Sequence, residues 1–410
     1  MAQRDTYAHN NLHPMTTAPQ IRKIAFLTGR DSPVSAVGVG SAGGHVTYMR
    51  ELTAAIARTG VKCITYVNNP QGETNATQNI SPNNLIVTVG TSARNDDAID
   101  NMTLFGEKVA SLIEPDVQIV HSHYWLGGVA ANIVSKRIGV PHIITYHTLN
   151  ATKAKHGEPS NATRGHYEKL ISQSVERICY SCPNDRLDIS QAFDAVDSKL
   201  SHIPPGVDHS IFFPGNTSEA ETFLGLQSCT TLMYVGRIER FKGLHILLET
   251  VNLLKHTDIQ LIVIGVVDSD TDYGREILTY VKDNELERIV TFIGAIEHES
   301  LARYYRAADI VIVPSEHESF GLVALEAMAC GTPVVTTTSF SEVPTHNTDG
   351  CVVVERSAEG ILEGIRKTVD RRHKYPPITD VLRKYSDAYS WDFCAQSTLD
   401  LYRSLCKPNI

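Results

Sequence analysis

The second half of the chain carries a basic loop whose residues suit the binding of a diphosphate. This loop is the run Val235-Gly-Arg-Ile-Glu-Arg-Phe-Lys-Gly243, which lies between a strand pattern and a helical pattern. In it, Arg237 can hold phosphate oxygens through two parallel hydrogen bonds, and Lys242 can act as a point charge. Together they could stabilise the charge that develops on a departing diphosphate. The alternative is a solvated basic turn, because arginine and lysine side chains are mostly exposed in folded proteins.

A second motif, further along the chain, carries two carboxylates around the start of a helix. It is the run Pro314-Ser-Glu-His-Glu-Ser-Phe-Gly-Leu-Val-Ala-Leu-Glu326, with Glu318 in the loop and Glu326 about two turns into the helix. The unpaired N–H groups that open such a helix favour an anion, and carboxylates can accept hydrogen bonds from sugar hydroxyls. Alternatively, Glu318 only complements the helix dipole. Glu326 fits a polar helix face poorly, because its neighbours are apolar and a buried carboxylate needs a partner.

Two short patterns are similar to metal motifs, but neither completes a predicted site. His121 and His123 fall on one face of a strand, and no third ligand is evident near them. Asp268 and Asp270 form an Asp-x-Asp pattern in a predicted loop. We therefore predict no obligatory metal. His147, at the end of another strand pattern, is by itself more typical of a structural histidine than of a catalytic one.

Alternating strands and helices would position these motifs. Apolar runs of strand length recur with helical patterns between them, first from residue 21 and again from residue 229. Such alternation predicts parallel sheets covered on both faces, so the predicted fold class is α/β with two doubly wound, Rossmann-like domains. The carboxyl ends of both sheets would then face one cleft. The predicted divisions are a flexible tail at 1–20, an N-terminal domain at 21–208, a linker at 209–228, a C-terminal domain at 229–388 and a final helical segment at 389–410.

Composition narrows the range of partners. The chain has 410 residues and a formal net charge of -9, which disfavours a general nucleic-acid binder because such proteins need a concentrated basic face. No apolar run approaches the ~20 residues of a membrane span, and residues 1–20 lack the apolar region of a secretory signal. We therefore predict a cytoplasmic chain without a transmembrane segment. Peripheral membrane contact through the short basic run Arg371-Arg-His-Lys374 stays open, as does a homodimer.

Taken together, these motifs resemble those of the retaining GT-B glycosyltransferases of family 4. In that family, as here, the pattern Gly-Arg-x-x-x-x-Lys-Gly precedes the pattern Glu-x-Phe-Gly-x-x-x-x-Glu. Within the family, the motifs are most similar to those of sucrose-phosphate synthase and of the mycothiol-pathway enzyme that glycosylates inositol phosphate. Further matches in the first half are Gly43-Gly44, His121-Ser-His-Tyr-Trp125, Thr145-Tyr-His-Thr-Leu149, Arg164-x-x-x-Glu168 and Pro204-Pro-Gly-Val-Asp208.

The resemblance implies a role for each matched residue. Arg237 and Lys242 would bind the donor diphosphate, Glu318 would contact the transferred sugar, and Glu326 would hold the ribose. His147 would orient the donor sugar or its developing charge. The final helical segment would cross back onto the first domain. The implied catalytic residues are His147, Arg237, Lys242 and Glu318, and the implied donor-binding residues are Gly43, Gly44, Arg237, Lys242, Glu318, Phe320, Gly321, Leu322 and Glu326.

The resemblance also indicates an acceptor site. Tyr124, Thr148, Lys153 and Arg164 match positions that the inositol-phosphate enzyme devotes to its acceptor phosphate, and such a set of side chains suits an anion. The predicted function is therefore transfer of a hexose or N-acetylhexosamine from a nucleotide-diphosphate sugar, with UDP as the carrier. The acceptor would be a small polar molecule, with a phosphorylated one as an option. The nucleotide sugar is a co-substrate, and no obligatory cofactor is expected.

Two other functions fit parts of the pattern. An enzyme similar to sucrose-phosphate synthase, or a phosphorylase, would use the same fold. Release of a nucleoside diphosphate identifies a transferase, whereas formation of a sugar phosphate identifies a phosphorylase. A non-catalytic module that binds nucleotide sugars or glycans is the alternative from another class, but such a module has no need for a complete set of leaving-group contacts.

Overall fold

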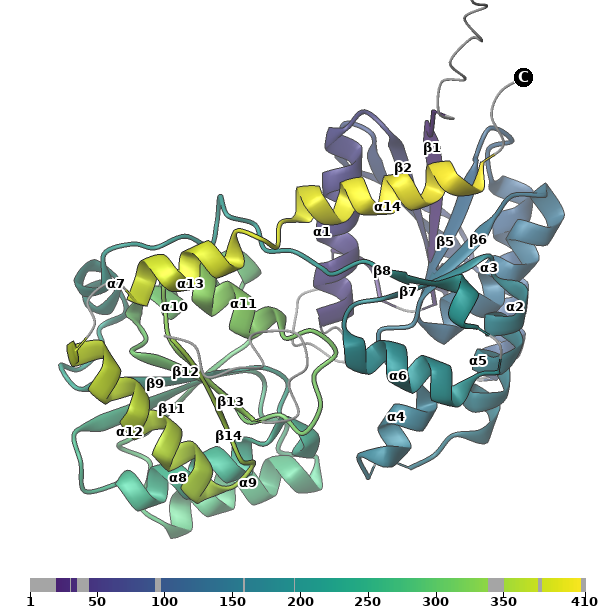
Figure 1. Ribbon diagram of the computed structural model, residues 1–410. Coiled ribbons are helices and arrows are strands. Elements are labelled where there is room, and N and C mark those ends of the chain that lie inside the picture. Colours follow the sequence, from purple (N-terminus) through teal and green to yellow (C-terminus); the bar gives the residue numbers. More distant parts are fainter. Residues whose placement is uncertain are drawn as a thin grey trace, which may run out of the picture.

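The structure is a computed structural model that describes residues 20–29, 31–34, 44–92, 97–157, 159–194, 196–337, 350–374 and 378–406. Within these ranges, two sheets covered by helices form two lobes, and the last helix reaches from one lobe to the other (Figure 1). The predicted α/β class with two Rossmann-like domains is therefore confirmed. The flexible tail expected at 1–20 falls outside the described residues except for Gln20, and the side chains of the basic run 371–374 are also outside them.

Short apolar runs form the strands of the first sheet. Strand β1 (Lys23–Thr28) is central and buried along its whole length, as expected of a parallel strand covered on both faces. In the described part of the chain, eight strands lie in the order β3-β4-β2-β1-β5-β6-β7-β8, and only the edge pair of β3 and β4 is antiparallel. The other strands are β2 (Lys62–Asn69), β3 (Ala76–Ser81), β4 (Asn84–Gly90), β5 (Ile119–His123), β6 (His142–Thr145), β7 (Arg177–Tyr180) and β8 (Leu200–His202).

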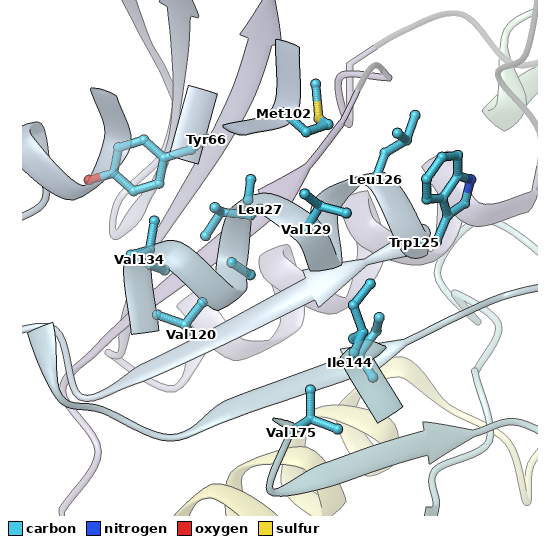
Figure 2. Close-up of a cluster of buried hydrophobic side chains, with 14 of the residues drawn as sticks. Leu27, Tyr66, Met102, Val120, Trp125, Leu126, Val129, Val134, Ile144 and Val175 are labelled. Carbon is cyan, nitrogen blue, oxygen red and sulfur yellow. The ribbon is translucent and has the colours of Figure 1, made fainter. Parts of the chain in front are cut away.

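The helices of the first domain pack their apolar faces on this sheet. Figure 2 shows one buried cluster, in which Val129 and Leu126 lie against Leu27 of β1. The approach is close at Gly127, where an added Cβ would lie 2.6 Å from the carbonyl oxygen of Leu27. The helical elements are α1 (Gly44–Arg58), α2 (Ala98–Leu112), α3 (Tyr124–Ile138), α4 (Asn150–Lys155), α5 (Ala162–Ser174), α6 (Pro183–Ala192) and the 3₁₀ turn η1 (Asp197–Lys199).

The second sheet repeats this architecture. Six parallel strands in the described residues follow the order β11-β10-β9-β12-β13-β14. They are β9 (Thr230–Val235), β10 (Ile259–Ile264), β11 (Val290–Gly294), β12 (Ile310–Val313), β13 (Val334–Thr337) and β14 (Cys351–Val354). The helical elements around them are η2 (Arg240–Lys242), α8 (Leu244–Leu254), α9 (Asp272–Asp283), η3 (His298–Ser300), α10 (Leu301–Ala307), α11 (Leu322–Ala329), α12 (Ala358–Lys374) and α13 (Ile378–Ser386).

Between the sheets, residues 209–228 are not purely a connecting loop. They contain helix α7 (Thr217–Leu224), and the side chain of Phe212 is buried in the core of the second domain. The side chain of Ala220 on α7 is also buried. The exact limits of the two domains and of the linker stay predictions, whereas the two sheets are present in the structure.

The final helix, α14 (Trp391–Leu405), crosses back and packs on helix α1 of the first domain (Figure 1, yellow). Trp391 and Leu399 join the apolar cluster that includes Tyr48 of α1. The hydroxyl of Tyr402 lies 2.5 Å from Nδ1 of His121, which is buried on strand β5. The predicted crossover is confirmed, and it attaches the second domain to the first at a site remote in sequence.

Candidate active site

The carboxyl ends of the two sheets open onto one cavity of about 730 Å³ between the domains. Strand β1 contributes Thr28 to its lining, and strand β9 contributes Val235 from the other domain. Parallel strands end at one edge of a sheet, so the loops that follow them meet here. Gly43 lies outside the described residues. The other predicted site residues all line the cavity: Gly44, Tyr124, His147, Thr148, Lys153, Arg164, Arg237, Lys242, Glu318, Phe320, Gly321, Leu322 and Glu326.

Lys242 and Glu318 form an ion pair in this lining. Lys242 closes the short turn η2, and its Nζ lies 2.5 Å from Oε1 of Glu318. The hydroxyl of Ser315 donates to the same oxygen at 2.7 Å. Burial is the largest single influence and acts to raise the pKa of Glu318. The charge and hydrogen bond of Lys242, together with the hydrogen bond of Ser315, outweigh burial, so the pKa lies below its ordinary value. The carboxylate is therefore ionised and can accept hydrogen bonds from hydroxyl groups.

Arg237 lies in the same loop as Lys242. Its NH1 group is 2.5 Å from Oε1 of Glu239, and its side chain is 32% exposed. Both cations lie close to the ring of Phe241, at 5.9 Å for Cζ of Arg237 and 5.2 Å for Nζ of Lys242 from the ring centroid. The N–H group of Glu316 donates to the carbonyl of Phe241 at 2.7 Å, which ties the acidic loop to the basic one. The two motifs therefore form one charged wall.

Two helices begin at the cavity. Helix α11 starts after Gly321, whose φ is 91°. Because glycine has no side chain, the N-cap residue does not occupy the N–H groups of the first turn. Helix α1 starts at Gly44, where an added Cβ would lie 3.9 Å from Cδ1 of Leu322. The first turns of both helices are thus close together. Because helix N-termini carry unpaired N–H groups and a partial positive charge, they add to the anion-binding character of the cavity.

Glu326 is buried on helix α11 and has two side-chain partners. Nε2 of His298 lies 2.7 Å from its Oε1, and the hydroxyl of Tyr305 donates to its Oε2 at 3.0 Å. The apolar surroundings of Glu326 predicted that it needs a partner, but they did not identify one. His298 falls in the run Glu-His-Glu-Ser, which is typical of an exposed turn. Its position in the sequence therefore did not predict that it contacts Glu326.

His147 has a strained backbone at the cavity wall. Its φ is 62°, in the left-handed region, and strain of this kind gathers at functional sites. Its Nε2 lies 3.0 Å from Nδ1 of His123, and the two rings are stacked. Burial lowers the pKa of His147 well below its ordinary value, and His123 and His45 lower it further, so the ring is neutral. The hydroxyl of Ser319, from the other domain, donates to the backbone carbonyl of His147 at 2.7 Å.

Three of the four predicted acceptor residues are in direct contact. Arg164 is buried, and its Nε lies 2.6 Å from Oε1 of Glu168. Its NH1 group donates to the hydroxyl of Tyr124 at 2.8 Å, and its NH2 group donates to the carbonyl of Thr148 at 2.5 Å. Lys153 lies on helix α4 and lines the same cavity. The structure therefore brings this set together around a cation whose position is held by Glu168.

The described residues contain neither a metal-binding cluster nor a membrane-spanning helix. Among these residues, no group of three histidine, cysteine or acidic side chains is placed to hold a metal ion. The predicted absence of an obligatory metal stays a prediction. None of the described helices has both the length and the apolar character needed to cross a bilayer.

Comparison with known proteins places both halves of the chain. Residues 42–211 match the model of Glycosyltransferase Family 4, and residues 227–380 match that of Glycosyl transferases group 1. A D-inositol 3-phosphate glycosyltransferase of Pseudarthrobacter chlorophenolicus is 31% identical, over 77% of this chain and 79% of the relative. A protein of the same description from Mycobacteroides abscessus is 31% identical, over 93% of this chain and 89% of the relative.

Solved structures agree with these sequence relatives. Sucrose-phosphate synthase from Thermosynechococcus elongatus superimposes with a TM-score of 0.84 at 26% identity, covering 94% of this chain and 99% of that one. Anabaena Alr3699/HepE in complex with UDP and glucose shares the fold, with a TM-score of 0.75 at 16% identity over 94% of this chain and 100% of that one. The chain therefore belongs to the group 1 glycosyltransferases of family 4, which have the GT-B fold and include the D-inositol 3-phosphate glycosyltransferases.

Proposed function

We propose that this glycosyltransferase retains the anomeric configuration while it moves a hexose or N-acetylhexosamine from a UDP-sugar to a small polar, phosphorylated acceptor. The observation that carries the proposal is the ion pair of Lys242 and Glu318 in the cavity. It supplies a cation for the diphosphate and an ionised carboxylate for the sugar hydroxyls on two loops that touch. UDP as carrier is supported by the structure of the fold relative from Anabaena, which holds UDP and glucose.

The donor would lie along the charged wall of the second domain. Arg237 and Lys242 would bind the diphosphate, aided by the N–H groups of Phe320, Gly321 and Leu322 at the start of α11. As the bond between the anomeric carbon and the phosphate oxygen breaks, negative charge develops on the diphosphate. Fixed cations and helix N–H groups stabilise that charge without having to reorganise.

Retention would follow from attack on the face that the diphosphate leaves. The acceptor hydroxyl oxygen forms the new bond to the anomeric carbon, and its proton passes to the departing phosphate oxygen. No separate general base is then required. The neutral ring of His147 would contact the donor sugar near the positive charge that develops at the anomeric carbon.

The acceptor would bind on the wall formed by the first domain. Arg164, oriented by Glu168, would bind a phosphate group together with Tyr124, Thr148 and Lys153. This acceptor chemistry is supported by the sequence relatives, whose name describes an inositol 3-phosphate glycosyltransferase.

The eight cysteines of this chain are free thiols, which supports a reducing cytoplasm as the location of the protein.

A ligand screen followed by product analysis tests the proposed function. A thermal-shift screen with UDP, GDP, ADP and dTDP identifies the carrier, because a ligand that binds only the native state raises Tm. The expected result is stabilisation by UDP and release of UDP from a UDP-sugar when an inositol phosphate is added. Formation of a sugar 1-phosphate would instead identify a phosphorylase. Binding of UDP without any turnover or hydrolysis of UDP-sugars would support a non-catalytic module.

A further inference from the structure

A line of hydrogen bonds crosses from helix α1 of the first domain to Glu326 of the second. The NH2 group of Arg50 lies 2.9 Å from Nδ1 of His298. The other ring nitrogen of His298 lies 2.7 Å from Oε1 of Glu326, whose second oxygen accepts from Tyr305 at 3.0 Å. Arg50 is itself held by Glu51, 2.9 Å from its Nε. A residue of one domain therefore touches the partner of a buried carboxylate in the other.

The hydrogen-bond donors determine where the protons lie. A guanidinium has no acceptor and stays protonated in proteins, so Nδ1 of His298 must accept from Arg50. Nε2 must then carry the ring proton and donate it to Glu326. At a pH above the pKa of its ring, His298 is thus neutral and in its Nε2–H form while it contacts Arg50. A doubly protonated ring would present an N–H group to the guanidinium, and the contact would be lost.

The same two donors prepare Glu326 to accept a pair of hydroxyl groups. A carboxylate has about four lone-pair sites, two on each oxygen. Among the described contacts, His298 occupies one site on Oε1 and Tyr305 occupies one on Oε2. One site is then left on each oxygen of a side chain that lines the cavity. Two adjacent acceptors match the vicinal 2′ and 3′ hydroxyls of a ribose.

We propose that His298 is a positioning residue that orients Glu326 for the donor ribose and does so fully only while Arg50 docks against it. This inference rests on the proposed function, together with the ribose-binding role that the family resemblance implies for Glu326. His298 touches no reacting atom and acts through the carboxylate. Helix α1 begins at Gly44 in the cavity and carries Arg50 further along, so docking of this helix supplies both a helix N-terminus and the required tautomer. Domain contact and donor affinity are thereby linked.

The link depends on pH, because a second proton on His298 removes its contact with Arg50. Burial acts to lower the pKa of His298, but the carboxylate of Glu326 outweighs burial and the pKa lies above its ordinary value. Of the other charged groups that face the ring, Arg50 lowers the pKa and Glu51 raises it, while Tyr305 shares the carboxylate. As the pH falls through this pKa, the ring becomes charged and the tie between the domains is lost.

Variants of His298 separate positioning from packing. His298→Ala removes both hydrogen bonds, and we expect it to raise the KM for the UDP-sugar about tenfold while kcat changes less than about twofold. His298→Gln offers one acceptor and one donor, as the neutral ring does, and it cannot titrate. We therefore expect His298→Gln to restore most of the donor affinity. A side chain that only fills space would not be rescued in this way.

The pH profile and Arg50 supply the second readout. The donor KM of the wild-type enzyme should rise as the pH falls from about 8 to about 6, and it should stay level in His298→Gln. Arg50→Ala should raise the donor KM about fivefold at neutral pH, because the tautomer is no longer imposed. Matched controls are His256→Ala, an exposed histidine, and Arg58→Ala, which lies on the same helix and pairs with Asp392. Both should leave the donor KM unchanged.

A separate variant distinguishes failure of this inference from failure of the proposed function. Glu326→Gln should weaken UDP binding, measured by calorimetry, and an unchanged affinity would overturn the ribose assignment itself. If Glu326→Gln weakens UDP binding while His298→Ala and Arg50→Ala do not alter the donor KM, the ribose assignment stands and the positioning role is wrong. A rise in the donor KM at low pH that persists in His298→Gln would also contradict the positioning role of His298.

Discussion

At the scale of single residues, the pairing of Lys242 with Glu318 determines the charge of the cavity wall. Both side chains are 19% exposed, so each would be costly to leave without its partner. In the proposed function, nucleotide binding would rearrange this pair, because a diphosphate would compete with the carboxylate for the ammonium group. The pair would keep both groups charged and in place until the donor binds.

This pair leads to a prediction about turnover. Glu318→Gln keeps the shape of the side chain but removes the charge that faces Lys242 and that would, in the proposed function, face the sugar hydroxyls. We expect kcat/KM for the UDP-sugar to fall about 100-fold, as is typical when a charge-stabilising contact is lost. Steady-state release of UDP measures the effect. Glu249→Gln, an exposed residue of α8, is the control and should keep wild-type kinetics.

Asp185 predicts a pH dependence of stability. It lies in the first turn of α6, and its carboxylate accepts from the N–H group of Ser181 at 3.2 Å. Burial raises the pKa of Asp185 to about 7, and the nearby Asp188 contributes in the same direction. An unfolded aspartate titrates near pH ~4, so the unfolded state ionises first and stability falls as the pH rises from about 4 to about 7.

Asp185→Asn removes this titration and keeps an acceptor for Ser181. We expect its Tm at pH 8 to exceed that of the wild-type protein by about 3 °C, with a smaller difference at pH 5. Thermal unfolding followed by circular dichroism measures both values. Asp283→Asn, at an exposed position of α9, should not change the profile. A lower Tm for Asp185→Asn at pH 8 would contradict the assignment.

At the scale of elements, close packing of α3 on β1 holds one wall of the cavity. Leu126 of α3 lines the cavity, and Gly127 allows the helix to approach the carbonyl of Leu27. We expect Gly127→Ala to lower the free energy of unfolding by about 2 kcal/mol, since the added methyl group has no room. Urea unfolding measures this change in the free energy of unfolding. The control is Gly165→Ala on α5, where the added methyl group would meet only the movable end of the Asn150 side chain, at 3.2 Å. A loss of unfolding free energy in this variant as large as that in Gly127→Ala would contradict the packing argument.

At the scale of the whole molecule, the cavity exists only where the two domains meet. Cross-domain contacts at its edge include the hydrogen bonds of Ser319 with His147 and of Arg50 with His298. Helix α14 also ties the second domain to α1. Neither domain surrounds a donor by itself, so binding should draw the two together.

Solution scattering tests this expectation. Saturating UDP should reduce the radius of gyration, because the diphosphate would contact the wall of one domain and the start of α1 in the other. Uridine, which lacks the diphosphate, is the control and should cause little compaction. An unchanged radius at saturating UDP would show that donor binding does not require closure.

The fold and the residues that line the site could be predicted because their signals are local. Apolar periodicity marks each strand and helix, and the loops after parallel strands must meet at one edge of each sheet. This is why Arg237, Glu318 and Arg164 line one cavity. The roles assigned to them depended on resemblance to a family, since the same residues at the same spacing also fit exposed turns.

Two α/β domains, a site between them and residue types suited to an anion can all be predicted from the order of the amino acids, because each of these signals is local. Most of the groups that hold the site residues in place become known only from the folded chain. His298 and Arg50 are 248 positions apart, and Ser319 and His147 are 172 apart, so no local pattern connects either pair. Their partners, protonation states and lone pairs depend on how two separately patterned domains dock, and docking depends on complementary surfaces that periodicity and spacing do not encode.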